Sequence, residues 1–268
     1  MKLFVVNVGV NTSHASRQGL RSPILPDRTF EFLPIPEDRC PTLATLPRYS
    51  DLSSRTRTWP NLGAIVPVAS RSRRVHADPD FDFMTYGDVL NSRAAALEYA
   101  AAGDQVWFLA RLWANDRVNF TGASAFHFVA NFEVDKNLLL PPDAAKLTFP
   151  VKNRVTMNPH WKRMDDGHKD TFRIIVANQA ESHRFVHAIE VTPSIAAHIY
   201  AAEAYDPISD EFVVGTGVVK NKNGRPRKFQ AFGSVTRAVQ VFLNSENADQ
   251  RPHLGALMDL ATQAGAIE

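Results

Sequence analysis

Two neighbouring stretches decide the fold: Gln105-Val106-Trp107-Phe108-Leu109-Ala110-Arg111-Leu112, and Phe126-His127-Phe128-Val129-Ala130-Asn131-Phe132-Glu133-Val134. In the first, Val106, Phe108 and Ala110 fall on one face. In the second, an apolar face runs from Phe126 to Val134, and His127, Asn131 and Glu133 fall on the opposite face. Alternation with a period of two predicts strands, and the loop over 113–124 lets the two strands pair antiparallel.

Weaker patterns extend this pair in both directions. Leu90, Ala94, Leu97 and Ala101 recur at helical spacing, so a helix is expected over 88–102, with Gly103 as its C-cap. Further strands are expected over 2–10, 29–34, 171–178, 185–191 and 211–220, and further helices over 194–205, 235–243 and 252–264. The segment 38–80 lacks periodicity and is expected to hold short elements or a functional flap. The sequence therefore predicts an α+β fold with a mostly antiparallel sheet.

Composition limits the class of protein. The chain has 268 residues, of which 44% are hydrophobic and 22% charged, and its net charge is +2, which is typical of a globular protein and fits one domain over 1–268. No apolar run is long enough to cross a bilayer. The lone Cys40 excludes an internal disulfide and a cysteine-rich zinc site, which favours a reducing, cytoplasmic compartment.

Positive charge is concentrated in three segments, 48–57, 71–74 and 220–228. The last contains Arg225, Arg227 and Lys228, which are candidates for contacts with nucleic-acid phosphates. Charge in solvated loops is the alternative interpretation for any one of these segments.

A polar cluster follows the first predicted strand. His14 is a candidate general base, and Glu31 is a candidate acid or a group that orients His14. Asn7 and Asn11 are candidates for base binding, and Arg21 can pair with a phosphate or a base edge. The alternative is turn chemistry, in which Asn and His side chains satisfy loose backbone groups.

The second candidate is His76-Ala77-Asp78-Pro79-Asp80. Two carboxylates and an imidazole this close can form an acid–base set or bind a divalent metal. We expect Asp78 and Asp80 to be catalytic without a metal, and we expect no metal ligands in the chain. The polar cluster that ends at Glu37 is expected to face the segment 76–88 across one cleft.

Several nucleotide-dependent classes are excluded by missing motifs. There is no Walker glycine loop, no Gly-x-Gly-x-x-Gly after a strand, no nucleophile elbow, no kinase set and no zinc-deaminase signature.

Three groups of motifs carry a resemblance to a known family. They are Asn7-Val8-Gly9-Val10-Asn11 with Arg21-Ser22-Pro23-Ile24 and Pro34-Ile35-Pro36-Glu37; Thr85-Tyr86-Gly87-Asp88; and Gly103-Asp104 with the strands at 107–112 and 132–134. Together they resemble the third of the nucleotide modification associated domain families. The resemblance implies a phage or bacterial protein of DNA base hypermodification, with DNA or a modified nucleotide and other base-modification enzymes as partners. It implies no mechanism, and the cofactor stays unknown.

Residues 84–140 are also similar to PUA-like domains, which include the EVE and ASCH domains. That similarity implies a small barrel in which Tyr86 or Trp107 stacks on a base, and in which Arg111 or Asn131 reads the edge of that base. Core packing is the alternative for both aromatic rings. Two functions follow from the resemblances: an enzyme that binds and modifies or processes a modified or flipped base, and a reader that binds such a base without altering it.

Overall fold

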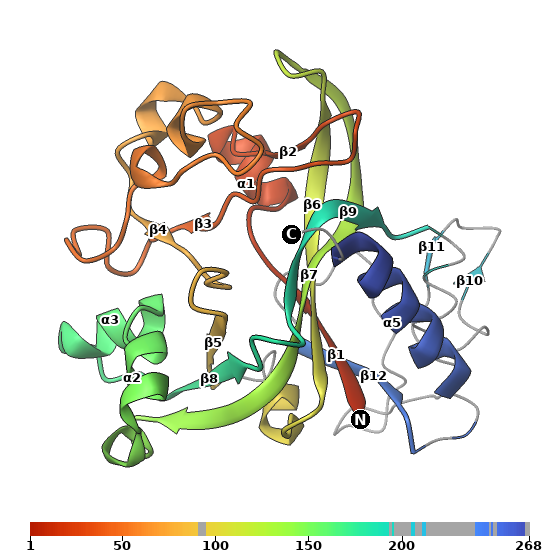
Figure 1. Cartoon of the computed structure of the whole chain (residues 1–268). Coiled ribbons are helices and arrows are strands. Elements are labelled where there is room, and N and C mark those ends of the chain that lie inside the picture. The colour runs from red at the N-terminus through yellow and green to blue at the C-terminus, as the bar shows by residue number, and fades with distance from the viewer. Residues whose placement is uncertain are drawn as a thin grey trace, which may run out of the picture.

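The computed structural model describes residues 1–90, 95–192, 195, 205–206, 211–212, 239–246, 248 and 251–265. Within them, one sheet of eight strands has the order β12-β1-β6-β7-β8-β5, with β2 added on β6 and β9 added on β7 (Figure 1). The strands are β1 (Lys2–Asn7), β2 (Ser22–Ile24), β5 (Thr85–Val89), β6 (Gln105–Asn115), β7 (Phe120–Leu140), β8 (Phe172–Ala177), β9 (His183–Glu190) and β12 (Val239–Asn244).

The sheet is mostly antiparallel, which confirms the predicted fold class. Only β1 and β2 run parallel to β6. In the described part of the chain, the path through the sheet ends at β12 and at β5, so the sheet is not closed into the barrel that the PUA-like alternative requires.

The central pair β6–β7 forms as predicted, with Val106 opposite Phe132 and Phe108 opposite Ala130. The prediction of one continuous apolar face from Phe126 to Val134 is wrong, however. The register shifts at Val129, where β7 has one extra residue. Because a bulge exchanges the two faces of a strand, Ala130 and Phe132 join the core of one face, and Phe128 joins the core of the other.

Each face of the sheet has its own core. On one face, Phe4 and Val6 of β1 pack with Phe108 of β6 and with Phe32. On the other face, α5 (Arg251–Gly265) buries Leu254 and Leu257 against a core that includes Trp107 of β6. Figure 1 shows α5 lying across this face. The predicted final helix is thus confirmed.

The segment between β2 and β5 contains short elements, as one of the two alternatives for residues 38–80 predicted. They are β3 (Ile35–Pro36), β4 (Val75–His76) and the 3-10 turns η1 (Tyr49–Asp51), η2 (Leu62–Ala64) and η3 (Val68–Ser70). With α1 (Thr12–Gln18), they surround a separate core that includes Val10, Leu33, Tyr49 and Val75. Of the strand predicted over 29–34, the structure has only an isolated antiparallel bridge of Phe30 with Ile24, and the amide of Leu33 bonds to the Ser22 hydroxyl.

Two predicted helices are wrong. Residues Thr85–Val89 pair with β8, so strand pairing replaces the expected helical start. Residues 91–94 lie outside the described part of the chain, and residues Ala95–Tyr99 form the 3-10 helix η4. Residues Val239–Asn244 form β12 against β1 in place of a helix. The helix predicted over 194–205 and the strand predicted over 211–220 lie almost entirely outside the described residues, apart from Ile195 and the short strands β10 (Tyr205–Asp206) and β11 (Glu211–Phe212).

Two helices between β7 and β8 were not predicted: α2 (Phe149–Val155) and α3 (Pro159–Asp165). The start of α3 has a clear local cause. The Asn158 side chain accepts the amide of His160, and Pro159 occupies the first helical position. This cap fixes the position of His160 in the first turn of α3.

Candidate functional site

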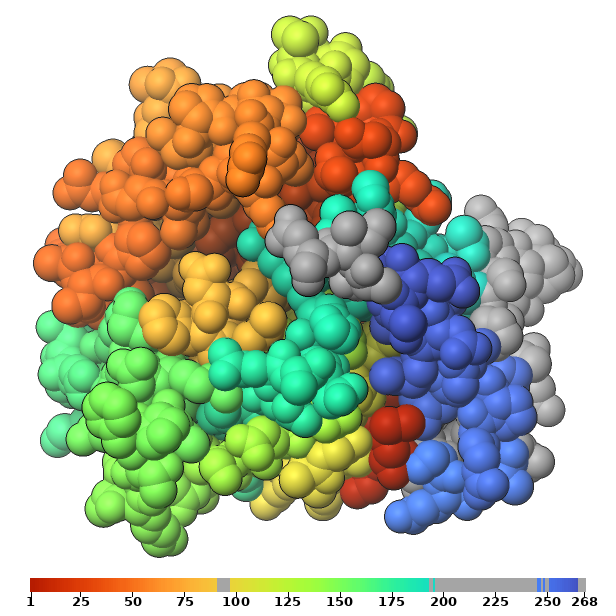
Figure 2. Space-filling view, in the orientation of Figure 1, coloured from red at the N-terminus to blue at the C-terminus, as the bar shows by residue number. Residues whose placement is uncertain are grey.

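The segment His76–Asp80 separates two cavities. His76 and Asp78 line a cavity of about 200 Å³, together with Asn7, Tyr86, Asp88 and His160. Ala77, Pro79 and Asp80 line a larger cavity of about 640 Å³, together with Phe32, Arg55, Phe81 and Arg184. In Figure 2 the surface is hollowed where the orange N-terminal residues meet the gold segment that leads into β5.

A buried charged network lies at the smaller cavity. The Glu37 side chain has no exposed surface, and its Oε2 accepts hydrogen bonds from Nε and Nη2 of Arg163, the first at 2.9 Å. Its Oε1 accepts the amides of Arg39 and Cys40. Nδ1 of His76 lies 3.2 Å from Oε2 of Glu37. The carboxylate therefore holds both an arginine and a histidine in place.

His76 continues this network to a second histidine and to a carboxylate. The Nε2 atoms of His76 and His160 lie 3.2 Å apart, and Oδ2 of Asp78 lies 3.4 Å from Nε2 of His160. Asp78 also accepts the amide of Gly87. The backbone of β5 must pass close to α3 here, because a Cβ at Gly87 would lie 2.7 Å from Cδ2 of His160.

Burial dominates the protonation of these groups. Burial opposes the charge of Glu37, but hydrogen bonds from His76 and the Cys40 amide, with the charge of Arg163, hold its pKa well below the usual range. Burial lowers the pKa of His76 to about 4 and that of His160 to about 3, and it raises the pKa of Asp78 to about 7. Both imidazoles are therefore neutral at neutral pH, and each keeps one nitrogen that can accept a proton or a metal ion.

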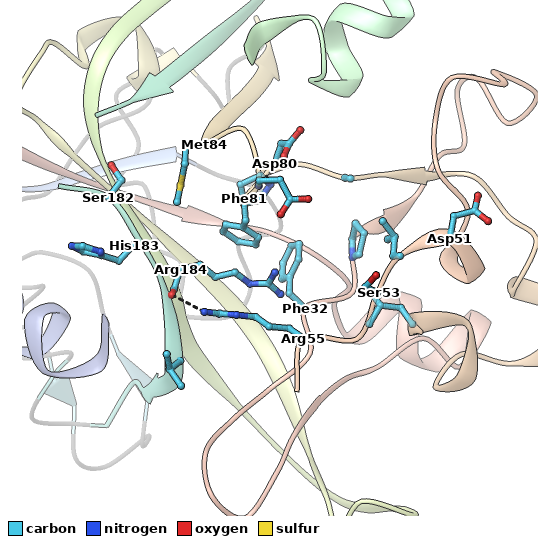
Figure 3. A pocket seen from close by; sticks show the side chains of 17 residues that line it. Phe32, Asp51, Ser53, Arg55, Asp80, Phe81, Met84, Ser182, His183 and Arg184 are labelled. Carbon is cyan, nitrogen blue, oxygen red and sulfur yellow. Dashed lines mark hydrogen bonds between the residues drawn. The ribbon is translucent and has the colours of Figure 1, made fainter. Parts of the chain in front are cut away.

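The larger cavity has an arginine at its centre. The guanidinium carbon of Arg184 lies 4.7 Å from the ring centroid of Phe81, and Figure 3 shows the side chain reaching past Phe81 toward Phe32 and Arg55. Burial, with the nearby charge of Arg55, lowers the pKa of Arg184 to about 10. Among the described residues its Nε has no hydrogen-bond partner and no carboxylate lies within ion-pair distance, although the charges of Glu31 and Asp82 favour its charged form.

Glu31 holds the neighbouring wall in place. Its carboxylate accepts hydrogen bonds from the hydroxyl of Ser54, the amide of Arg55 and both the amide and the hydroxyl of Thr56. Arg55 in turn donates to the carbonyls of Phe185 and Arg184. Glu31 thus holds residues 54–56, and with them Arg55, in position.

The structure brings only part of the predicted N-terminal cluster to the cavities. Asn7 lines the smaller cavity, and Glu37 holds His76 beside it. Asn11 and His14 form the N-terminal cap of α1, which is the turn chemistry named as the alternative. Arg21 lies over the Phe120 ring, away from both cavities.

The base-binding candidates of the PUA-like alternative are mostly core residues. Trp107 is fully buried, with its ring edge-on to Phe128, so it has no free face for a base. Asn131 is buried and donates to Gln105, and Arg111 stacks on Phe126. Tyr86 is buried as well, although it lines the smaller cavity. Arg225, Arg227 and Lys228 lie outside the described residues.

Sequence reasoning missed Arg163 and Arg184, and it assigned His160 no place in a buried charged network. Arg163 reaches Glu37 across 126 residues of chain, and no local pattern indicates such a pair. The Asn158-Pro159 cap was the one available signal, because it predicts a helix start immediately before His160.

Fold and site together define an α+β protein with an open sheet and a buried charged network between two cavities. The chain belongs to the nucleotide modification associated domain 3 family, whose model matches residues 2–207. Neither curated proteins nor solved structures gave a match. In the described part of the chain, no helix has the length and apolar character to span a membrane.

Proposed function

We propose that this protein acts in the modification of DNA bases and that its larger cavity holds the nucleotide. The observation that carries the proposal is the environment of Arg184. A half-buried guanidinium that has no described carboxylate in ion-pair contact favours an anionic ligand, and arginine binds phosphate in two-point contacts. The family membership supports the same class of ligand.

The other walls of the cavity suit a base. Phe32 is buried and lies edge to face with Phe81, with the ring centroids 5.3 Å apart, so the half-buried Phe81 is the ring that could contact a base. Stacking of a base on an aromatic ring stabilises a complex by roughly 1–3 kcal/mol. The cavity volume of about 640 Å³ falls in the usual range for small-molecule sites. A nucleotide bound here would contact both an arginine and an aromatic ring.

Asp80 is the candidate acid–base group at this cavity. Its Oδ1 accepts the amides of Asp82 and Phe83, and burial raises its pKa above the usual value. A carboxylate whose pKa moves toward neutrality exchanges protons more readily at physiological pH. We therefore favour an enzyme that modifies or processes the base, acting on DNA in the cytoplasm beside other base-modification enzymes.

An analysis of the nucleoside composition of cellular DNA tests this proposal. Mass spectrometry would compare DNA from cells with the native gene, from a deletion strain, and from deletion strains complemented with wild type, Arg184→Met or Arg117→Met. Arg117 is an exposed control that pairs with Asp27. We expect the deletion and Arg184→Met to change the same nucleoside, and Arg117→Met to restore it. Identical nucleosides in all strains would contradict the proposal that the protein is an enzyme. Preferential binding of modified over unmodified DNA would then favour the alternative, a protein that binds a modified base without altering it.

A further inference from the structure

The smaller cavity has a feature that nucleotide binding does not explain. Nε2 of His76, Nε2 of His160 and Oδ2 of Asp78 converge at separations of 3.2, 3.4 and 3.9 Å. All three residues are buried, and these three atoms can approach a single ion. Three potential ligands from β4, α3 and the segment before β5 therefore meet at one point.

The spacing matches metal coordination. A triangle with these sides has a point about 2.0 Å from every corner, which is close to the usual Zn–N and Zn–O bond lengths. No side chain would have to move far to bind an ion at that point. Two imidazoles with one carboxylate suit zinc or ferrous iron better than calcium or magnesium, which prefer oxygen ligands alone.

The surrounding residues orient these ligands as in known metal sites. Glu37 lies at Nδ1 of His76, so the carboxylate fixes the proton on Nδ1 and leaves the Nε2 lone pair facing His160. Asp78 is held by the Gly87 amide and by Nδ2 of Asn158. A carboxylate behind a ligating histidine is the usual outer partner of a metal site.

We propose that His76, Asp78 and His160 bind one divalent transition-metal ion, with its open coordination positions toward the cavity that Asn7 and Asp88 line. Three protein ligands with an open position are the arrangement of catalytic metal sites, in which a bound water becomes a nucleophile near neutral pH. The alternative is that no metal binds here and that one imidazole donates a hydrogen bond to the other.

Metal analysis of the purified full-length chain separates the two. After dialysis against a chelator, the protein is loaded with Zn²⁺, freed of excess ion and analysed by mass spectrometry. We expect about one ion per wild-type chain and a loss of at least about tenfold in affinity for His76→Gln and His160→Gln. His187→Gln is the matched control, because His187 bonds to the Asp27 carbonyl away from the cluster. Wild type without bound zinc, or ligand variants that bind as well as His187→Gln, would overturn the proposal.

Cobalt provides a readout on the wild-type chain alone. The amide of Cys40 bonds to Glu37, so the Cys40 thiol lies near the cluster. The experiment must therefore distinguish the proposed ligands from a set that includes this sulfur. A Co²⁺-loaded chain with only nitrogen and oxygen ligands shows d–d bands without a thiolate charge-transfer band. A thiolate band would overturn the proposed ligands. Neither measurement uses a nucleotide, so the metal site can fail while the proposed function stands, or the reverse.

Discussion

At the scale of single residues, the most informative contact is the buried pair of Glu37 and Arg163. Their side chains are 0% and 10% exposed, so each charge depends on the other for compensation. Removing one partner of such a pair leaves an uncompensated buried charge, which destabilises a protein strongly even where the intact pair contributes little. The pair should therefore be intolerant of substitution.

Urea unfolding of Glu37→Gln, with a chelator present to exclude any metal contribution, measures this effect. We expect a loss of about 3 kcal/mol in the free energy of unfolding, because the glutamine keeps the shape but not the charge. Asp38→Asn is the matched control, since Asp38 is 66% exposed in its pair with Arg73 and should change stability by less than about 1 kcal/mol. Equal losses in the two variants would contradict the account of the buried pair.

The sequence indicated some of these residues for sound reasons. The density of carboxylates and histidine over 76–88 pointed to His76 and Asp78, which do lie together. Arg163 and Arg184 carried no such signal, because an arginine in a helix or strand is ordinarily a solvated charge. Their roles come from partners distant in the chain.

At the scale of elements, the approach of β5 to α3 positions the smaller cavity. Gly87 is the closest point, with Cδ2 of His160 and Oδ1 of Asn158 near the position of a Cβ. Neither neighbour can move freely, because Asn158 caps α3 and His160 is buried. The glycine is therefore required for packing here.

Thermal or urea unfolding of two alanine variants tests that requirement. Gly87→Ala should destabilise the protein by about 1–3 kcal/mol, since the new methyl group forces β5 and α3 apart. Gly255→Ala places the same methyl group in α5 where nothing lies within 4 Å, and it should be neutral or stabilise by up to about 1 kcal/mol. A Gly87→Ala variant as stable as Gly255→Ala would contradict the described packing.

Elements were predictable where a local pattern matched the tertiary structure. β6 follows from alternation, and α5 follows from its helical spacing. The bulge at Val129 was not predictable, since alternation continues in the sequence while the strand shifts by one residue. The helix expected over 88–102 is wrong at Asp88 and Val89, because these two residues pair with Arg173 and Phe172 of β8.

At the scale of the molecule, the two sides of the sheet differ. The face covered by α5 is an apolar core, whereas residues of the segment 10–84 line much of both cavities. β12 and α5 lie beyond the residues that the family model matches, yet they complete one edge and one face of the sheet. We therefore propose that the whole chain forms one domain.

We propose that Arg184 binds the phosphate of a nucleotide in the larger cavity. Calorimetric titration of wild type, Arg184→Met and Arg117→Met with a panel of deoxynucleoside monophosphates and the corresponding nucleosides tests this directly. We expect wild type and Arg117→Met to bind a monophosphate more tightly than its nucleoside. Arg184→Met should lose about tenfold or more in affinity for the monophosphate and little for the nucleoside, as loss of a charge-assisted contact predicts. Equal monophosphate binding by wild type and Arg184→Met, or no binding by any of the three proteins, would contradict the claim.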